Sequence, residues 1–270
     1  VDMCVSLNII SGYPDGSFKP EGNITRAEFC KMICVMLNGG ETPATATNTT
    51  PTFSDIRTSA NASWAEGFIE YCYAKGIVSG VGDGKFNPNG NVTATEAAKM
   101  LLVALGYNAD VESYTGAAWA LKVNVQANQD GLYKDLEKID TNAALTRDNA
   151  AQMVWNALQA YVINKSSSID RTDGSVTDIY SKGDVDMLAD KYGTSEMTGT
   201  LVASGALTIE DGENVSAPGE DKFVVEFRTT VDGVATTDTK TFKLEGSDMS
   251  DLIGKDVKVI YKVEKNQTTI

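Results

Sequence analysis

Residues 9–29 read IISGYPDGSFKPEGNITRAEF, and residues 77–97 repeat this stretch as IVSGVGDGKFNPNGNVTATEA. The two copies start 68 positions apart (77 − 9 = 68), and a duplication of this kind sets the architecture before any local pattern does. Each copy holds a glycine turn, an Asp-Gly turn and then a threonine followed three residues later by glutamate. That spacing is a capping box, in which the two side chains satisfy backbone amides at a helix start. We therefore expect helices to begin after Thr25 and Thr93.

Apolar residues follow each capping box at the spacing of one helix face. They occupy positions i, i+3, i+4, i+7 and i+8, which form a single stripe that a helix can bury. The two stripes are Phe29, Met32, Ile33, Met36 and Leu37, then Ala97, Met100, Leu101, Ala104 and Leu105. Both copies are therefore predicted to pack the same helix face into a core.

A third, more diverged copy follows the second. Thr146-Arg147 stands where Thr25-Arg26 stands in the first copy, and Trp119 matches Trp64 at an offset of 55 (119 − 64 = 55). This copy lacks the Asp-Gly-x-Phe turn, and Asn149 replaces the capping glutamate. Its helix start should be weaker by a fraction of the ~1 kcal/mol that a cap contributes.

The sequence divides into five segments. Three repeats span 1–38, 53–107 and 114–163, a linker spans 164–176, and a β domain spans 177–270. The first repeat lacks a counterpart of Phe53-Ser54-Asp55, so we expect it to be incomplete at its N-terminus. Residues 39–52 read as an exposed loop, because they are rich in Thr, Ala and Pro.

The period changes after the predicted linker. Alternating or β-branched runs at 199–203, 222–227, 239–244 and 256–263 are separated by turn residues and predict antiparallel strands. We expect a small sandwich or OB-like barrel, with a helical turn at 249–253 and a short helix at 185–192. The fold class is thus α+β and multidomain, with a mostly helical N-terminal part.

Composition limits the functions that fit. The net charge of −14 argues against nucleic acid or anionic lipid as a partner for the bulk surface. Histidine is absent, which removes His-dependent catalytic triads and the usual zinc or copper sites. No apolar run approaches the roughly 20 residues of a membrane span, and no signal peptide is recognisable. We predict a non-enzymatic chain without cofactor or metal.

Four cysteines fall at helix positions of the repeats. Cys4 and Cys72 occupy equivalent sites, while Cys30 and Cys34 align with Ala98 and Leu102 of the second copy. Free cysteine behaves as a small buried hydrophobe, so we expect core residues. A Cys4–Cys72 disulfide is the alternative.

The glycine, Asp-Gly, Phe-x-Pro and Ile-Thr-Arg-Ala-Glu-Phe succession resembles the S-layer homology (SLH) module. The resemblance covers residues 1–163, about 60% of the chain. It implies a mostly helical prism of three repeats with pseudo-threefold symmetry and ligand grooves between neighbouring repeats. The implied ligand is a bacterial secondary cell-wall polysaccharide, often carrying an anionic pyruvylated sugar.

The resemblance also implies a set of binding residues. The arginine of the Thr-Arg-Ala-Glu motif would meet the sugar carboxylate, because a guanidinium binds carboxylate through two hydrogen bonds. Ala94 replaces this arginine in the second repeat, so at most two grooves should bind an anion. The predicted binding residues are Arg26, Arg147, Thr25, Thr146, Trp64, Trp119, Asp55, Gly12 and Gly80.

Each assignment has a structural alternative. Arg26 could be a solvated residue of a first helical turn, and Arg147 could pair with its neighbour Asp148. Trp64 and Trp119 could be core residues instead of platforms for sugar rings.

The predicted function is non-covalent anchoring of an extracellular, S-layer-like protein to the bacterial cell wall. One alternative is an anchor attached to a wall-bound glycoside hydrolase or protease. Another is a subunit that associates with itself into a lattice or filament.

Overall fold

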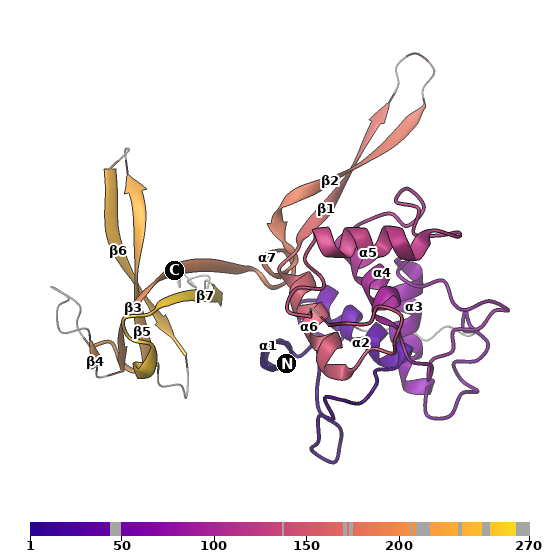
Figure 1. The fold of residues 1–270 in the computed structure, drawn as a ribbon, viewed down its shortest axis with the longest axis horizontal. Helices are drawn as coiled ribbons and strands as arrows, with labels where there is room; N and C mark the ends of the chain where they lie inside the picture. Colours follow the sequence, from indigo (N-terminus) through magenta and orange to yellow (C-terminus); the bar gives the residue numbers. More distant parts are fainter. Residues whose placement is uncertain are drawn as a thin grey trace, which may run out of the picture. The chain divides into compact units, whose positions relative to one another are not determined.

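The computed structural model describes residues 1–43, 50–136, 138–169, 172, 175–205, 207–208, 217–231, 234–244 and 249–262. Helices and antiparallel sheets are both present, which confirms the α+β class. The chain forms two compact units, Val1–Tyr192 and Gly193–Ile270 (Figure 1). Parts of the predicted loop at 39–52, the linker and the β domain lie outside the described residues.

The first unit is mostly helical. Its helices are α1 (Asp2–Ser6), α2 (Arg26–Leu37), the 3₁₀ helix η1 (Ser63–Ala65), α3 (Glu66–Ala74), α4 (Ala94–Leu105), α5 (Trp119–Gln129), α6 (Arg147–Leu158) and α7 (Met187–Tyr192). Helix α3 packs on α2, α5 packs on α4, and α1 packs on α6. Each short first helix of a sequence copy therefore packs against the second helix of the preceding copy, and α1 closes the cycle.

The predicted helix starts are present at α2, α4 and α6. The hydroxyls of Thr25 and Thr93 accept the amides of Glu28 and Glu96, and each glutamate carboxylate accepts the threonine amide in return. At α6 the Thr146 hydroxyl accepts the Asn149 amide without a returned bond from a carboxylate, as the sequence predicts.

Backbone hydrogen bonds join these three helix starts in a ring. The Ile24 amide donates to the Leu145 carbonyl at 2.9 Å, Leu145 to Val92 at 2.8 Å, and Val92 to Ile24 at 3.2 Å. Ile24 and Val92 are 68 positions apart in the sequence (92 − 24 = 68), and Val92 and Leu145 are 53 apart (145 − 92 = 53). The three residues nevertheless meet around one axis. The ring fixes how the three helix N-termini face their neighbours, and it places the candidate site.

The cysteines are free and buried, as predicted. The Cys4 thiol donates to the Ala151 carbonyl at 3.4 Å, and the Cys72 thiol donates to the Cys30 carbonyl at 3.6 Å. These two bonds are equivalent in the repeat alignment, and each ties a first helix to the helix on which it packs.

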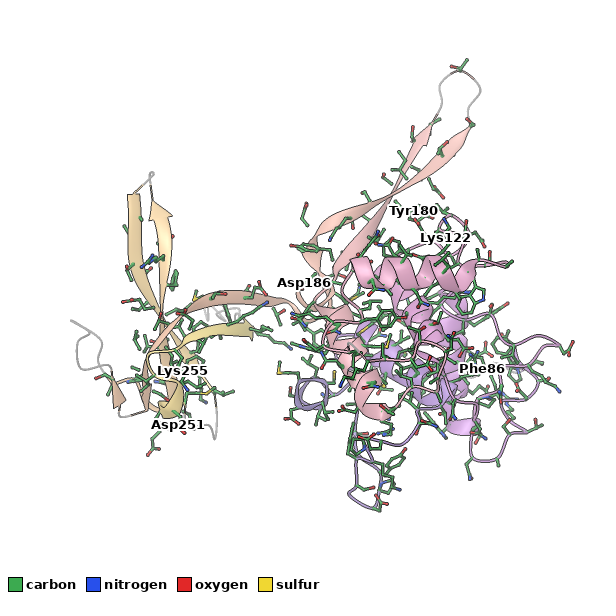
Figure 2. All side chains as sticks on the ribbon, in the orientation of Figure 1. Phe86, Lys122, Tyr180, Asp186, Asp251 and Lys255 are labelled. Carbon is green, nitrogen blue, oxygen red and sulfur yellow. The ribbon has the colours of Figure 1, made fainter. Side chains whose placement is uncertain are left out.

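The predicted linker at 164–176 is wrong. Strand β1 (Tyr161–Ile169) pairs antiparallel with β2 (Val176–Asp186) in a two-stranded hairpin. Serine-rich sequence reads as a linker because it lacks apolar residues, but here Asp178 bonds across the strands to Lys165 and Ser167. Asn108 donates to the Tyr180 hydroxyl at 3.0 Å, which ties the hairpin to the helices. Figure 2 labels Tyr180 on the hairpin.

The predicted start of the β domain at 177 is wrong for the same reason. Strand β2 belongs to the first unit, and the division between units falls after Tyr192. The predicted short helix at 185–192 is α7, the last element before this division.

The second unit is a five-stranded antiparallel sheet. Its elements are β3 (Thr194–Gly205), β4 (Leu207–Thr208), β5 (Gly219–Val231), β6 (Val234–Lys243), the 3₁₀ helix η2 (Ser250–Leu252) and β7 (Asp256–Lys262). The order is β4-β3-β5-β6, with β7 paired to the first half of β3. At Gly199 a Cβ would collide with the Glu226 carbonyl, so only glycine allows β3 and β5 to approach this closely.

Aromatic side chains show that this sheet curls. The rings of Phe242 on β6 and Tyr261 on β7 lie 5.0 Å apart. A flat sheet would separate these strands by about three strand spacings of ~4.8 Å, so β7 folds over towards β6. Within the described residues of the second unit, strands β3 to β7 all belong to one sheet. The finer expectation of a sandwich or OB-like barrel stays a prediction.

Candidate functional site

Arg147 links the start of α6 to the turn residues of the first repeat. Its Nε donates to the Phe18 carbonyl and its Nη2 to the Ser11 carbonyl, each at 3.0 Å. Its Nη1 lies 3.6 Å from Glu28 Oε1, and the guanidinium lies 4.5 Å from the ring centre of Tyr13. The side chain is only 5% exposed, so it is built into the junction between two segments.

Arg26 makes the equivalent junction one repeat later. Its Nε donates to the Phe86 carbonyl at 3.0 Å, and its Nη1 lies 3.6 Å from Glu96 Oε1. The guanidinium lies 4.7 Å from the Phe86 ring centre. The alternative that Arg26 is a solvated surface residue is therefore wrong, because the residue is only 8% exposed.

The charges at these junctions complement one another. An arginine in a first helical turn faces the positive end of the helix dipole, which is unfavourable by itself. Glu28 offsets this charge at Arg147 while its other carboxylate oxygen caps Thr25. Asp148 was the alternative partner for Arg147, but its side chain is exposed. Arg147 forms its ion pair with Glu28.

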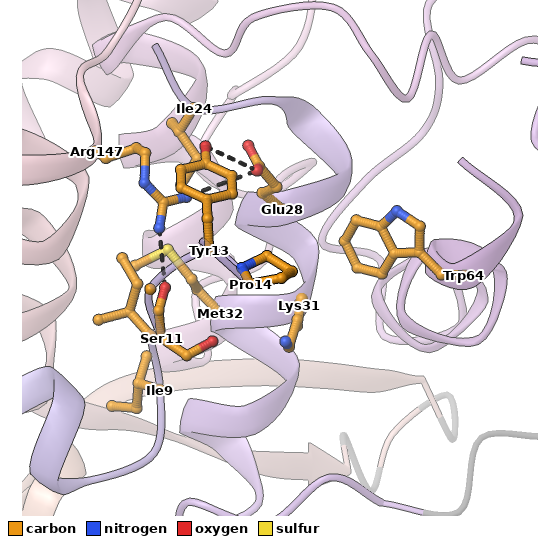
Figure 3. A pocket seen from close by; sticks show the side chains of 12 residues that line it. Ile9, Ser11, Tyr13, Pro14, Ile24, Glu28, Lys31, Met32, Trp64 and Arg147 are labelled. Atoms are coloured by element: carbon orange, nitrogen blue, oxygen red, sulfur yellow. Dashed lines mark hydrogen bonds and ion pairs between the residues drawn. The ribbon is translucent and has the colours of Figure 1, made fainter. Parts of the chain in front are cut away.

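A pocket of about 370 Å³ opens beside Arg147 (Figure 3). Three predicted site residues, Gly12, Trp64 and Arg147, line it together, although they come from three different repeats of the sequence. Trp64 stands across from Glu28 and is 48% exposed, with one side against Phe68. The half-exposed indole gives the pocket one flat apolar wall, and the buried Arg147 with the half-buried Glu28 gives it one polar wall.

Residues that the sequence reasoning missed also line this pocket. Ser11, Tyr13, Glu28 and Lys31 are among them, and the Tyr13 hydroxyl donates to Glu28 Oε1 at 3.5 Å. The sequence contained a pattern that could have identified Glu28 and Lys31 as site residues. Both recur at the repeat spacing, as Glu96 and Lys99. Residues three apart share a helix face, so the repeated pair pointed to one surface of α2 and α4.

The equivalent surface beside Arg26 has a matching tryptophan and lysine. The Lys99 amine lies 5.5 Å from the ring centre of Trp119, which is half-buried at the start of α5. Burial lowers the pKa of Lys99, and the nearby carboxylate of Asp110 opposes this shift. An ammonium held over an indole in this way is a cation–π pair. Lys99 follows Glu96, the ion-pair partner of Arg26, by three residues on α4.

The junction at Ala94 is different. Thr95 donates through its hydroxyl to the Thr141 carbonyl at 2.9 Å, and it contacts Asn124 at 3.2 Å. The Tyr133 hydroxyl donates to the same Asn124 oxygen at 2.6 Å. Neutral hydrogen bonds thus occupy the region where the other two junctions place a guanidinium.

The remaining predicted site residues hold turns or cap helices. Asp55 accepts the amides of Phe86 and Asn87, both at 2.8 Å. Gly80 has a φ of +81°, and a Cβ there would strike the Phe53 ring. Thr25 and Thr146 cap their helices. None of these four lines the pocket beside Arg147.

Among the residues that the structure describes, no group of three or more Cys, Asp or Glu side chains could hold a metal ion. No helix in that part of the chain is long and apolar enough to cross a membrane.

Residues 1–30 and 52–98 match the family model of the S-layer homology domain. These two ranges of the chain are similar to the SLH domain. It is 29% identical over 154 residues to the middle cell wall protein of Brevibacillus brevis, covering 57% of the chain and 14% of that protein. It is 36% identical over 106 residues to a surface layer protein of Brevibacillus choshinensis, covering 39% of the chain and 9% of that protein.

A third relative is named for anchoring. The chain is 35% identical over 113 residues to the cellulosome-anchoring protein of Acetivibrio thermocellus, covering 42% of the chain and 24% of that protein. The chain thus spans no more than about a quarter of the length of these relatives.

Proposed function

We propose that residues 1–163 anchor a bacterial surface protein to cell-wall polysaccharide, with 114–163 acting as the third SLH repeat. The cell wall and surface layer proteins among the relatives support an extracellular location at the wall. The observation that carries the proposal is the convergence of Gly12, Trp64 and Arg147, from three repeats, on one pocket of about 370 Å³.

The pocket suits a sugar ring that carries a negative charge. A guanidinium has five N–H donors, and two carbonyls take two of those on Arg147. Arg147 also lies 3.6 Å from Glu28 and lines the pocket, where the Lys31 side chain adds a second cation. The exposed face of Trp64 supplies the apolar surface for stacking. We infer that a pyruvyl carboxylate meets Arg147 and Lys31 while the sugar ring stacks on Trp64.

Two such sites are proposed for this chain. The Arg26 junction has the same arginine–glutamate pair and its own tryptophan, Trp119. The Ala94 junction has no arginine, and neutral hydrogen bonds fill it. The binding residues proposed from resemblance therefore narrow to the two arginines, the two tryptophans and Gly12.

A pull-down on purified cell-wall sacculi tests this function. Trp64→Ala and Lys31→Gln should each weaken retention roughly tenfold, as truncation of a central contact does. Tyr161→Ala is the matched control, because Tyr161 is a similarly exposed aromatic residue (45%) on the hairpin, outside the pocket. Depyruvylated sacculi should retain less protein. Equal retention of all variants and wild type would contradict the proposal.

Relatives that carry this domain include an enzyme. The exoglucanase XynX of Acetivibrio thermocellus is 32% identical over 105 residues, which are 38% of the chain and 9% of that protein. We propose that the SLH part of the present chain binds and does not catalyse, whatever the function of the whole protein.

A further inference from the structure

The loop that carries Trp64 is closed by an ion pair between Arg57 and Glu66. Arg57 Nε donates to Glu66 Oε2 and its Nη2 donates to Glu66 Oε1, each at 2.7 Å. Two parallel bonds between a guanidinium and a carboxylate fix the orientation of both groups. Because the two residues are nine positions apart (66 − 57 = 9), the pair holds both ends of one loop, and Trp64 lies within it.

Glu66 anchors this pair at the start of a helix. It lies in the first turn of α3, where a negative charge is favourable, and its side chain is only 5% exposed. Hydrogen bonding to Arg57 lowers the pKa of Glu66, and burial opposes this shift. A buried carboxylate is destabilising without a cation. Arg57, whose side chain is 44% exposed, therefore has a fixed partner on the helix.

The Trp64 indole has little packing of its own. Its side chain is 48% exposed, and its ring meets that of Phe68 at 6.1 Å. Figure 3 shows it projecting from the adjoining helical turn towards the pocket that it lines. That turn is the 3₁₀ helix η1, and such turns have poorer hydrogen-bond geometry than an α-helix. The place of the indole therefore depends on how the backbone of the loop is held.

A second side chain tethers the middle of the same loop. Asn89 Nδ2 donates to the Ala60 carbonyl at 2.8 Å, and Asn61 next to it has a left-handed φ of 55°. This bond leaves residues 62–66 to be held from the helix side. The two bonds between Arg57 and Glu66 close that part of the loop, which includes Trp64.

The third repeat holds its tryptophan by other means. Addition of 55 to positions 57 and 66 gives Glu112 and Leu121 (57 + 55 = 112; 66 + 55 = 121), which cannot form an ion pair. The Lys99 amine lies 5.5 Å from the ring centre of Trp119 instead. A change at Arg57 should therefore reach the pocket that Trp64 lines and spare the site at Trp119.

We propose that Arg57 is a positioning residue for sugar binding, which acts through Glu66 to hold Trp64 as the apolar wall of the pocket. This inference rests on the proposed function, because it takes the sugar ring to stack on Trp64. Arg57 is not among the residues that line the pocket, so its effect on affinity is indirect. An indole that is already held in its binding orientation loses less conformational freedom when the ligand arrives.

Time-resolved fluorescence anisotropy of the free protein tests the positioning without a ligand. Trp119→Phe and Trp155→Phe leave Trp64 as the single tryptophan, because the chain has three. In this background Arg57→Gln should roughly double the amplitude of the nanosecond motion of the indole. Lys165→Gln is the matched control, because it removes the cation of another 2.7 Å ion pair, on the hairpin. Unchanged motion in Arg57→Gln would overturn the proposal.

Calorimetric titration with a pyruvylated wall polysaccharide fragment then tests the effect on binding. In Trp119→Ala, which keeps the Trp64 site, Arg57→Gln should weaken binding roughly fivefold, and Arg57→Lys, which retains the charge, should restore part of the affinity. In Trp64→Ala, which keeps the other site, Arg57→Gln should have no effect. Equal weakening of both sites would show a general loss of structure and overturn the proposal. A looser indole in Arg57→Gln together with no binding by the wild type would refute the proposed function and leave the role of Arg57 in holding Trp64 intact.

Discussion

The Arg147 and Ala94 junctions use the same scaffold for different chemistry. Both lie at a threonine-capped helix start, and both belong to the ring of backbone bonds through Ile24, Val92 and Leu145. At one, a buried guanidinium joins two carbonyls and a glutamate; at the other, Thr95 and its neighbours make neutral bonds. Both junctions therefore keep the ring and the threonine cap, while the charge at the junction differs between them.

The largest effect should come from removal of the buried arginines. Arg147→Ala leaves Glu28 without its cation and two carbonyls without donors, so the free energy of unfolding should fall by about 3 kcal/mol. Arg26→Ala removes one carbonyl bond and should cost about 2 kcal/mol. Denaturation followed by circular dichroism measures both losses.

Lys122→Ala, at an exposed position of α5, serves as the control for these two variants. A loss at Arg147 no larger than that of the control would show that the junction does not depend on its charge.

A smaller effect should appear in a double-mutant cycle. Arg147→Ala combined with Glu28→Ala should show a coupling free energy of about 1 kcal/mol, because the charges lie 3.6 Å apart. Arg147→Ala combined with Asp148→Ala should show almost none. Equal coupling to both acids would restore Asp148 as the partner.

Completion of the third capping box should give a gain of a few tenths of a kcal/mol. In Asn149→Glu the new carboxylate can accept the Thr146 amide, as Glu28 does for Thr25. Glu96→Asn in the second repeat should give a larger loss, because Glu96 caps Thr93 and also pairs with the buried Arg26. Thermal unfolding of the two variants checks both signs, and a loss in Asn149→Glu would refute the equivalence of the helix starts.

The smallest difference between repeats should be in the reactivity of Cys4 and Cys72, because both thiols occupy the same position of the shared scaffold. Burial raises the pKa of Cys4 to about 11, an effect that the N-terminal amine opposes only in part. Hydrogen bonding to Cys30 and burial raise the pKa of Cys72. Both thiols should therefore stay protonated and resist a thiol reagent at pH 8 until unfolding. Rapid modification of the native protein would contradict the burial at both sites.

The sequence predicted what depends on local spacing. The caps at Thr25 and Thr93, the buried stripes and the free cysteines follow from helix periodicity and short-range bonds. The hairpin at 161–186 was missed because it is formed by backbone pairing between 161–169 and 176–186, which lie apart in the sequence. A serine-rich run does not show such pairing in advance.

The site was predicted in part for a similar reason. Gly12, Trp64 and Arg147 line one pocket, and their role in binding stays a prediction. Burial of the arginines and the bonds from Arg147 to Phe18 and Ser11 depend on how distant turns approach, which no local pattern records. Asp55 was placed near the groove, but it holds the turn at Phe86.

Calorimetric titration with a soluble, pyruvylated wall polysaccharide fragment tests the comparison between junctions most directly. The account predicts two sites of equal affinity per chain for wild type. Either Trp64→Ala or Trp119→Ala should leave one site at that affinity, and the double variant should leave none, because each affected site binds roughly tenfold more weakly. Three sites in the wild type, or two sites retained in the double variant, would contradict the claim that the arginine junctions bind and the Ala94 junction does not.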